Sequence, residues 1–533
     1  MAQNMLSIPD LSILVGYFCL VSWIGLRVAR NQKNADTYFV TKKKIPGWIM
    51  GLSLFAATLS SFTFIGFPGW TYRHDMQIIV REYMAIVGMA VATIFVIPIY
   101  RSVVKMSVHE YLEHRYGYFA RAYTSVGIVL ITPVGIGVLL YVLCLALHGL
   151  TGISLPLLIL AIGIVTVVYT VRGGIEGCIY TEAINGAMFI GAGLLTLGYL
   201  LFFATDGGPR EILQVASAGQ KFKIAEPDFD LTRPTLWLFI WVGFFHFLNN
   251  YTGAPHVVQR YLVAPTYASA VRGSWLNIGC CLVTWFTFMS IGTLLWAFYQ
   301  IHPERLAGIK EIDSIFPFFM GSELPMGLAG LILAGLLASG IAGISSGINS
   351  TSACIQSDFY DRWAKASSPQ RRLRFSKRCV FLLGAIGIGV ALLLTLWEGG
   401  IVQFSADIIM ATLGPVFGSG HLTVFFLGIF TRRTSKRGMY VGLVTAALFA
   451  VWAVFTNPLG PVGRYTSPHL DFLPGFHLHP WFLFGLANLT AFVSAYVASL
   501  ILDPGKLAPK ELTIYGRAKS PLTTPDGSQV LKP

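Results

Sequence analysis

Polar side chains lie within two otherwise apolar stretches of the chain, residues 51–72 and 244–260. They include Ser60, Thr63, Asn249 and Asn250. Ser60 and Thr63 are three residues apart, so they share one face of a helix. Hydroxyls and amides both donate and accept hydrogen bonds, which suits them to binding a small polar molecule. Alternatively, the hydroxyls bond carbonyls of their own helix, and the amides satisfy backbone groups freed by a break.

Charged residues also occur within apolar stretches, where a buried charge is costly and therefore a functional candidate by default. Glu82 would accept hydrogen bonds from a sugar or polyol. Its neighbour Arg81 would clamp a carboxylate, or it forms an interfacial ion pair with its head group at the membrane surface. Asp407 and His421 are further candidates for a cavity, whereas we expect His246 to be a packing residue.

Composition indicates a membrane protein with many spans. The 533 residues are 54% hydrophobic and 12% charged, with a mean hydropathy of +0.65. A soluble chain would carry about twice that charged fraction. The net charge of +13 does not indicate nucleic-acid binding, because the basic residues lie in loops between apolar spans. The seven cysteines form no CxxC pair and are expected to pack in the spans rather than bind metal.

Apolar segments of about 20 residues predict an all-α bundle of about thirteen transmembrane helices. They fall near 9–28, 47–70, 77–104, 122–147, 153–171, 178–204, 233–256, 274–298, 323–358, 379–398, 401–430, 438–456 and 481–502. Pro68 with Gly69, and Gly253 with Pro255, predict that two of these helices are interrupted. Interrupted backbone at membrane depth is tolerated where it is buried in protein or lines a wet cavity.

Both interrupted helices open a block of five spans, and an odd number of spans makes the second block enter from the opposite side. This is the geometry of an inverted repeat, with a binding site at the breaks. The predicted units are an extra helix with an inner loop (1–46), the first repeat (47–204), an external loop (205–232), the second repeat (233–430), two accessory helices (431–502) and a tail (503–533).

Several motifs resemble the sodium/solute symporter family. They are SLFAATLSSFTFIGFPG, SVHEYLEHRYG, GGIEGCIYTEAING, VVQRYLVAP, GISSGINSTSACIQSDFY and FFLGIFTRRTSKRGMYVG, in this order from about residue 50 to 445. The resemblance implies a LeuT-type fold, a five-plus-five inverted repeat with one preceding helix, and cation-driven uptake by alternating access. The motif after residue 52 is similar to carriers of sialic acid, sugars or small carboxylates.

The resemblance also implies roles for single residues. Ser60, Thr63 and Glu82 occupy positions that hold the substrate in the family. Sialic-acid carriers place an arginine on the helix that matches 122–147, and no basic residue occurs there in this chain. This argues against a carboxylate substrate, unless Arg81 replaces the missing group.

For the coupling ion, the resemblance implies a sodium site made by the carbonyls of Ala56, Leu59 and Ser339 and by two hydroxyls. The hydroxyl positions hold Ala342 and Gly343 here, which leaves only the three carbonyls. One turn further inward, some family members hold a second sodium with an acidic residue. Glu182, Ser345 and Ser346 match that position and form the predicted working cation site. Protonation of Glu182 would instead make the carrier proton-coupled, and Glu182 facing the inner vestibule is the simpler alternative.

We therefore expect a Na⁺-coupled symporter of a small polar solute, preferably a monosaccharide, without an organic cofactor or enzyme activity. The protein is expected to be monomeric and to contact membrane lipid. The alternatives are a proton-coupled or uncoupled carrier of a small carboxylate or amino acid, and a membrane sensor with a symporter-like fold.

Most of the 38 lysines and arginines fall in alternate loops, seven of them in 362–378. Inner loops are enriched in basic residues, so we predict a cell-membrane protein with its N-terminus outside and its C-terminus in the cytoplasm. In a cysteine-free background, an impermeant thiol reagent added to intact cells should label a single cysteine at 215 and not one in 362–378. Labelling of the second position alone would reverse the orientation.

Overall fold

The computed structural model describes residues 6–28, 35–39, 45–306, 315–364, 368–396, 411–470 and 473–519. Throughout this part of the chain the regular structure is helical, as the sequence predicts. Nine described helices are long and apolar enough to cross a membrane, or up to eleven if each of two bent pairs is one span.

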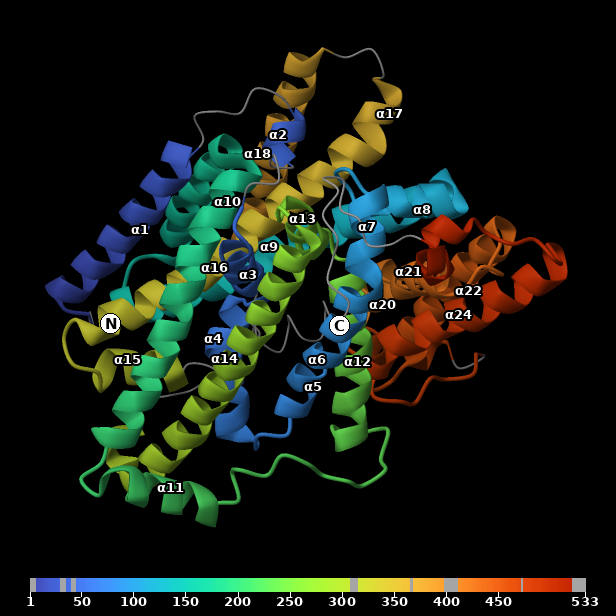
Figure 1. Ribbon diagram of the computed structural model, residues 1–533. Coiled ribbons are helices and arrows are strands. Elements are labelled where there is room, and N and C mark those ends of the chain that lie inside the picture. The colour runs from blue at the N-terminus through green and yellow to red at the C-terminus, as the bar shows by residue number, and fades with distance from the viewer. Residues whose placement is uncertain are drawn as a thin grey trace.

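Long helices form most of the bundle (Figure 1). They are α1 (Ile8–Val28), α9 (Tyr118–Thr151), α10 (Leu155–Phe202), α14 (Tyr267–Ile301), α16 (Leu328–Cys354), α18 (Pro369–Leu394), α22 (Lys436–Thr456) and α24 (Leu483–Leu502). The predicted span 77–104 consists of α5 (Ile79–Tyr83), α6 (Ala85–Val91), a π-helical turn at Ala92–Val96 and α7 (Ile97–Val103). Helices α22 and α24 pack against each other at one edge of the bundle (Figure 1).

The first predicted interruption is present but lies earlier than the sequence indicates. Helix α3 (Gly47–Thr58) and helix α4 (Ser61–Arg73) meet at an angle of 56°. The break is at Leu59 and Ser60, which have extended backbone. Pro68 lies inside α4, where it removes one backbone hydrogen bond without ending the helix.

The second interruption lies where the sequence places it. Helix α12 (Leu236–Gly253) ends at Ala254, whose ψ of 124° is extended, and α13 (Pro255–Val263) follows directly. Proline at the first position of a helix loses no bond, because that amide has no partner within the helix. The break therefore separates two well-formed helices rather than bending one.

Other elements differ in extent from the predicted spans. The predicted helices 153–171 and 178–204 form α10, which Gly174 divides with a φ of 54°, a conformation that glycine adopts without strain. The predicted loop 362–378 is shorter, because α18 already begins at Pro369.

Of the predicted span 401–430, the structure describes α20 (Gly414–Phe417) and α21 (His421–Phe430), and Asp407 lies outside the described residues. The expected count of thirteen is not confirmed, since α10 counts once and α12–α13 is not among the eleven.

The extra helix α1 packs along α10 and α16 (Figure 1). Its Asp10 Oδ1 accepts hydrogen bonds from the amides of Gly327 and Gly330, at 2.8 and 2.7 Å. The amides in the first turn of a helix have no partner within the helix. Asp10 therefore caps α16 from a different element. Further along α1, the Tyr17 hydroxyl donates to Asn185 Oδ1 on α10 at 2.6 Å.

Removing this cap should destabilise the protein. Asp10→Ala should cost about 1–2 kcal/mol, because the loss of a capping oxygen leaves buried amides unpaired. The measurement is the thermal unfolding midpoint of the purified protein in detergent. Asp10→Asn keeps a carbonyl acceptor and should lose less, and Ser12→Ala, on the same helix, is the matched control. Equal midpoints for Asp10→Ala and wild type would contradict the capping role.

Candidate functional site

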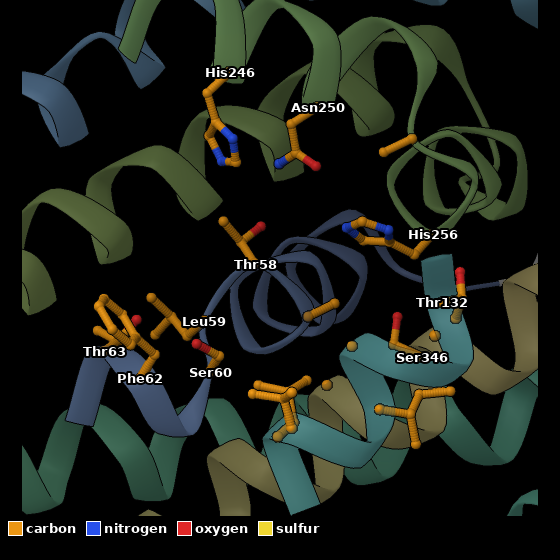
Figure 2. A pocket seen from close by; sticks show the side chains of 18 of the residues that line it. Thr58, Leu59, Ser60, Phe62, Thr63, Thr132, His246, Asn250, His256 and Ser346 are labelled. Carbon is orange, nitrogen blue, oxygen red and sulfur yellow. The ribbon is translucent and has the colours of Figure 1, made fainter. Parts of the chain in front are cut away.

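A cavity of about 530 Å³ lies where the two broken helices meet. Its walls come from α3, α4, α5, α9, α12, α13, α14 and α16. From α16 only residues in its second half line the cavity, so the space extends toward the end of the bundle at which α16 finishes. Five of the six predicted substrate residues line it: Ser60, Thr63, Arg81, Glu82 and Asn250. Side chains from both broken helices surround the same space (Figure 2).

Several polar lining residues were not predicted as site residues. They are Thr58, Thr132, His246, His256, Ser350 and Thr351. His246 was expected to be a packing residue, but it lies four residues before Asn250 and shares its side of α12 (Figure 2). Helical spacing from Asn250 was the signal that could have identified it.

The break in the first helix leaves the Ser60 hydroxyl available to a ligand. Ser60 stands at the N-terminal cap of α4, yet its side chain makes no capping bond. The neighbouring Thr58 hydroxyl instead donates to the Leu54 carbonyl at 2.8 Å. Back-bonding, the alternative considered for the hydroxyls of this stretch, therefore occurs at Thr58, outside the predicted pair.

Arg81 and Glu82 form an ion pair at the edge of the cavity. The distance from Arg81 Nη1 to Glu82 Oε1 is 3.3 Å, and their side chains are only 7% and 5% exposed. Within the described part of the chain, Arg81 Nε and Glu82 Oε1 have no hydrogen-bond partner. Buried polar atoms without partners are costly. A polar solute in the cavity would supply the missing bonds.

Asn249 is not part of the cavity lining. Its Oδ1 lies 2.8 Å from Nδ1 of His421, at the start of α21. This contact links the broken α12 to α21 outside the cavity. The adjacent asparagines of the sequence therefore have different surroundings, one in the cavity and the other between helices.

The end of α3 faces α16, as the sodium site implied by the resemblance requires. A side-chain carbon built on Gly343 would lie 3.9 Å from the Leu59 carbonyl oxygen. A hydroxyl at this position would reach the carbonyls at the end of α3, and glycine supplies none. Ala56 lies in the last turn of α3, and the Ser339 hydroxyl donates to the Leu336 carbonyl at 2.8 Å.

Glu182, the acidic residue of the predicted inner cation site, pairs with an arginine. Arg260 Nη2 lies 2.5 Å from Glu182 Oε2 and donates to Ser346 Oγ at 2.9 Å. Both charged side chains are buried, at 1% and 0% exposure, so Glu182 does not face a vestibule. Ser345 donates to the Ala342 carbonyl at 3.2 Å. The positive charge beside Glu182 in this structure is thus Arg260.

The predicted spans 233–256 and 274–298 leave Arg260 in the loop between them, and the structure corrects this. The residue lies in α13, which continues the broken span beyond the predicted end at 256. Arg260 lies five positions after Pro255, which is more than one helical turn. Pro255 as the first residue of a new helix was therefore the sequence signal that Arg260 belongs to a helix rather than to a loop.

A helical membrane bundle with two interrupted spans around a polar cavity has the architecture of a secondary transporter. Comparisons with known proteins agree with this class. The profile of the sodium:solute symporter family matches residues 38–446. The sodium/sialic acid symporters NanT of Aliivibrio fischeri and SiaT of Proteus mirabilis are each 31% identical to the chain. The alignments cover 82% and 84% of this chain, and 86% and 90% of the relatives.

A solved structure is also similar to this chain. The chain superimposes on a substrate-bound, outward-open Na⁺-coupled sialic acid symporter with a TM-score of 0.82 and 29% identity. The match covers 93% of this chain and 98% of the other. The chain belongs to the sodium:solute symporter family. It is a multi-pass membrane protein of sodium-coupled transport, and its relatives are transporters rather than enzymes.

The two asparagines should separate in their effects. Asn250→Ala removes a cavity side chain and should weaken solute binding about five- to tenfold, which corresponds to about 1 kcal/mol. Asn249→Ala removes the contact with His421 and should lower the thermal midpoint with little change in solute affinity. Solute binding and thermal unfolding of both variants provide the comparison. Weaker solute binding in Asn249→Ala together with unchanged binding in Asn250→Ala would contradict the position of the cavity.

Proposed function

We propose that the protein takes up a small, uncharged, hydroxyl-rich solute, a monosaccharide, together with sodium. The observation that carries the proposal is the character of the cavity. Its mostly apolar lining carries seven hydroxyls, one amide and two imidazoles, and its one charged pair, Arg81 with Glu82, has no net charge. Glu82 Oε1 would accept a sugar hydroxyl, and Arg81 Nε would donate to one.

The relatives named above carry sialic acid, which is an acidic sugar. The argument for a neutral sugar here is the wall formed by α9. Its lining residues are Ile128, Ile131, Thr132, Gly135, Ile136, Val138, Leu139 and Val142. None carries a positive charge, so this wall offers no partner for a carboxylate. A small carboxylate is the second candidate, because Arg81 Nε lacks a hydrogen-bond partner.

We propose two cation positions, one at the end of α3 beside the break and one further inward. The carbonyls of Ala56, Leu59 and Ser339 form one position, with waters in place of the absent hydroxyls. Glu182, Ser345 and Ser346 form the inner position, with a proton as the alternative ion. The helix end at α3 supports the first, because the last carbonyls of a helix carry partial negative charge and have no partner within the helix.

Alternating access would expose this cavity first to one side of the membrane and then to the other. Thr63 and Arg81 line one part of the cavity, and Ser350 and Thr351 line its extension along α16. With the N-terminus outside, α16 ends on the cytoplasmic side, and this extension is the inner half of the pathway. We also propose that the protein acts as a monomer in contact with lipid.

The experiment is uptake by proteoliposomes with a panel of labelled neutral monosaccharides, sialic acid and small monocarboxylates. A sodium gradient at constant pH should drive accumulation of a monosaccharide, and a pH gradient without sodium should not. Glu82→Ala should weaken affinity for that solute ten- to a hundredfold, since a buried bond partner is worth about 1–3 kcal/mol.

Glu323→Ala is the control and should leave affinity unchanged. It removes a carboxylate that pairs with Arg305 just beyond α15 (Ile315–Ser322) and does not line the cavity. Unchanged affinity in Glu82→Ala would remove Glu82 from the site. Accumulation of a carboxylate that Arg81→Ala abolishes would establish the second candidate. Uptake driven only by the pH gradient would make the protein a proton symporter.

A further inference from the structure

Arg260 lies at the centre of a closed network that joins four helices. Its Nη2 contacts Glu182 on α10 and Ser346 on α16, and its Nε donates to Ser53 on α3 at 2.9 Å. The Ser53 hydroxyl also donates to Glu182 Oε2 at 2.5 Å. On its own helix, Nη1 donates to the His256 carbonyl. The guanidinium is therefore held by α3, α10, α13 and α16 together.

The acceptor atoms that hold Arg260 are those that a metal cation would need. A free cation at this position would bind the Glu182 carboxylate and the Ser346 hydroxyl. The guanidinium already contacts Glu182 Oε2 and Ser346 Oγ, whereas Glu182 Oε1 has no hydrogen-bond partner among the described residues. Two unit positive charges about 4 Å apart repel by about 4 kcal/mol at the effective dielectric constant of 20 that suits protein sites. One carboxylate in a buried site cannot hold both.

We propose that Arg260 is a tethered occupant of the inner cation position, and that a free cation binds Glu182 only after the guanidinium has left. This inference rests on the proposed coupling to sodium at Glu182. Before and after the exchange the buried carboxylate has one positive partner, because a bare carboxylate at this depth would be strongly destabilising. Arg260 is a positioning residue in this scheme and does not contact the solute, because it is not among the residues that line the cavity.

The exchange would also connect the ion to the helices that move. Arg260 belongs to α13, the half-helix beyond the break at Ala254, whereas its partners belong to α3, α10 and α16. When the guanidinium leaves Glu182, α13 loses three side-chain contacts with these helices. The arrival of the cation therefore loosens α13, and its departure allows α13 to dock again.

The test is direct binding of radioactive sodium to the purified protein in detergent. Arg260→Gln removes the competing cation, so the sodium concentration for half-saturation should fall at least tenfold. Arg260→Lys keeps the charge but cannot bridge the same acceptors, so its half-saturation should lie between those of Arg260→Gln and wild type. Glu182→Gln combined with Arg260→Gln removes both charges and should lose the gain in affinity.

Arg101→Gln is the matched control. Arg101 lies beside the end of α13, where its guanidinium donates to the carbonyls of Tyr261, Ala264 and Pro265 and contacts no carboxylate. This variant should bind sodium as wild type does. If Arg260→Gln does not fold, the half-saturating sodium concentration of Arg260→Lys is the test, because this variant preserves the charge balance of the site.

The outcomes separate this inference from the proposed function. A wild type that binds sodium, with a folded Arg260→Gln or Arg260→Lys of equal or weaker affinity, overturns the role of Arg260 and leaves sodium coupling intact. A wild type that binds no sodium, with an Arg260→Gln that does, overturns sodium coupling and supports exclusion by Arg260.

Discussion

Backbone groups without helical partners are the constraint on which this structure depends. Within a bilayer each amide and carbonyl needs a partner inside the protein, and an interrupted helix leaves several without one. The breaks at Leu59–Ser60 and at Ala254 face each other across one cavity. Polar side chains of both broken helices line that space together with apolar ones.

Glu82 and Glu182 are both buried and both pair with an arginine, but their surroundings differ. Glu82 has an arginine as its sequence neighbour, and atoms of both side chains have no hydrogen-bond partner within the described part of the chain. Glu182 has an arginine from a distant helix, and serine hydroxyls complete the network. The first pair is open to a solute, whereas the second is closed within protein. Each of these two pairs has no net charge.

The sequence was sufficient for the helical class, the interrupted spans and five of the polar residues that line the cavity. These follow from hydropathy and from polar residues in apolar runs, which are local properties. The exact break near Ser60 was not predictable, because Pro68 is the stronger local signal and tertiary packing tolerates it within α4. The different surroundings of Asn249 and Asn250 depend on the rotation of α12, which hydropathy does not determine. Arg260 was missed because counting charges in loops assumes that a basic residue beside a span faces water.

The cap that Asp10 supplies has a consequence for the order in which the bundle is completed. The amides of Gly327 and Gly330 follow Asp10 by 317 and 320 residues, so α1 is synthesised long before α16 exists. Close in sequence, Ser7 donates its amide and its hydroxyl to the Asp10 carboxylate. The first turn of α16 likewise remains uncapped until it reaches a helix made at the beginning of translation. The seam between α1 and α16 therefore closes late, and its closure joins the start of the chain to the second repeat.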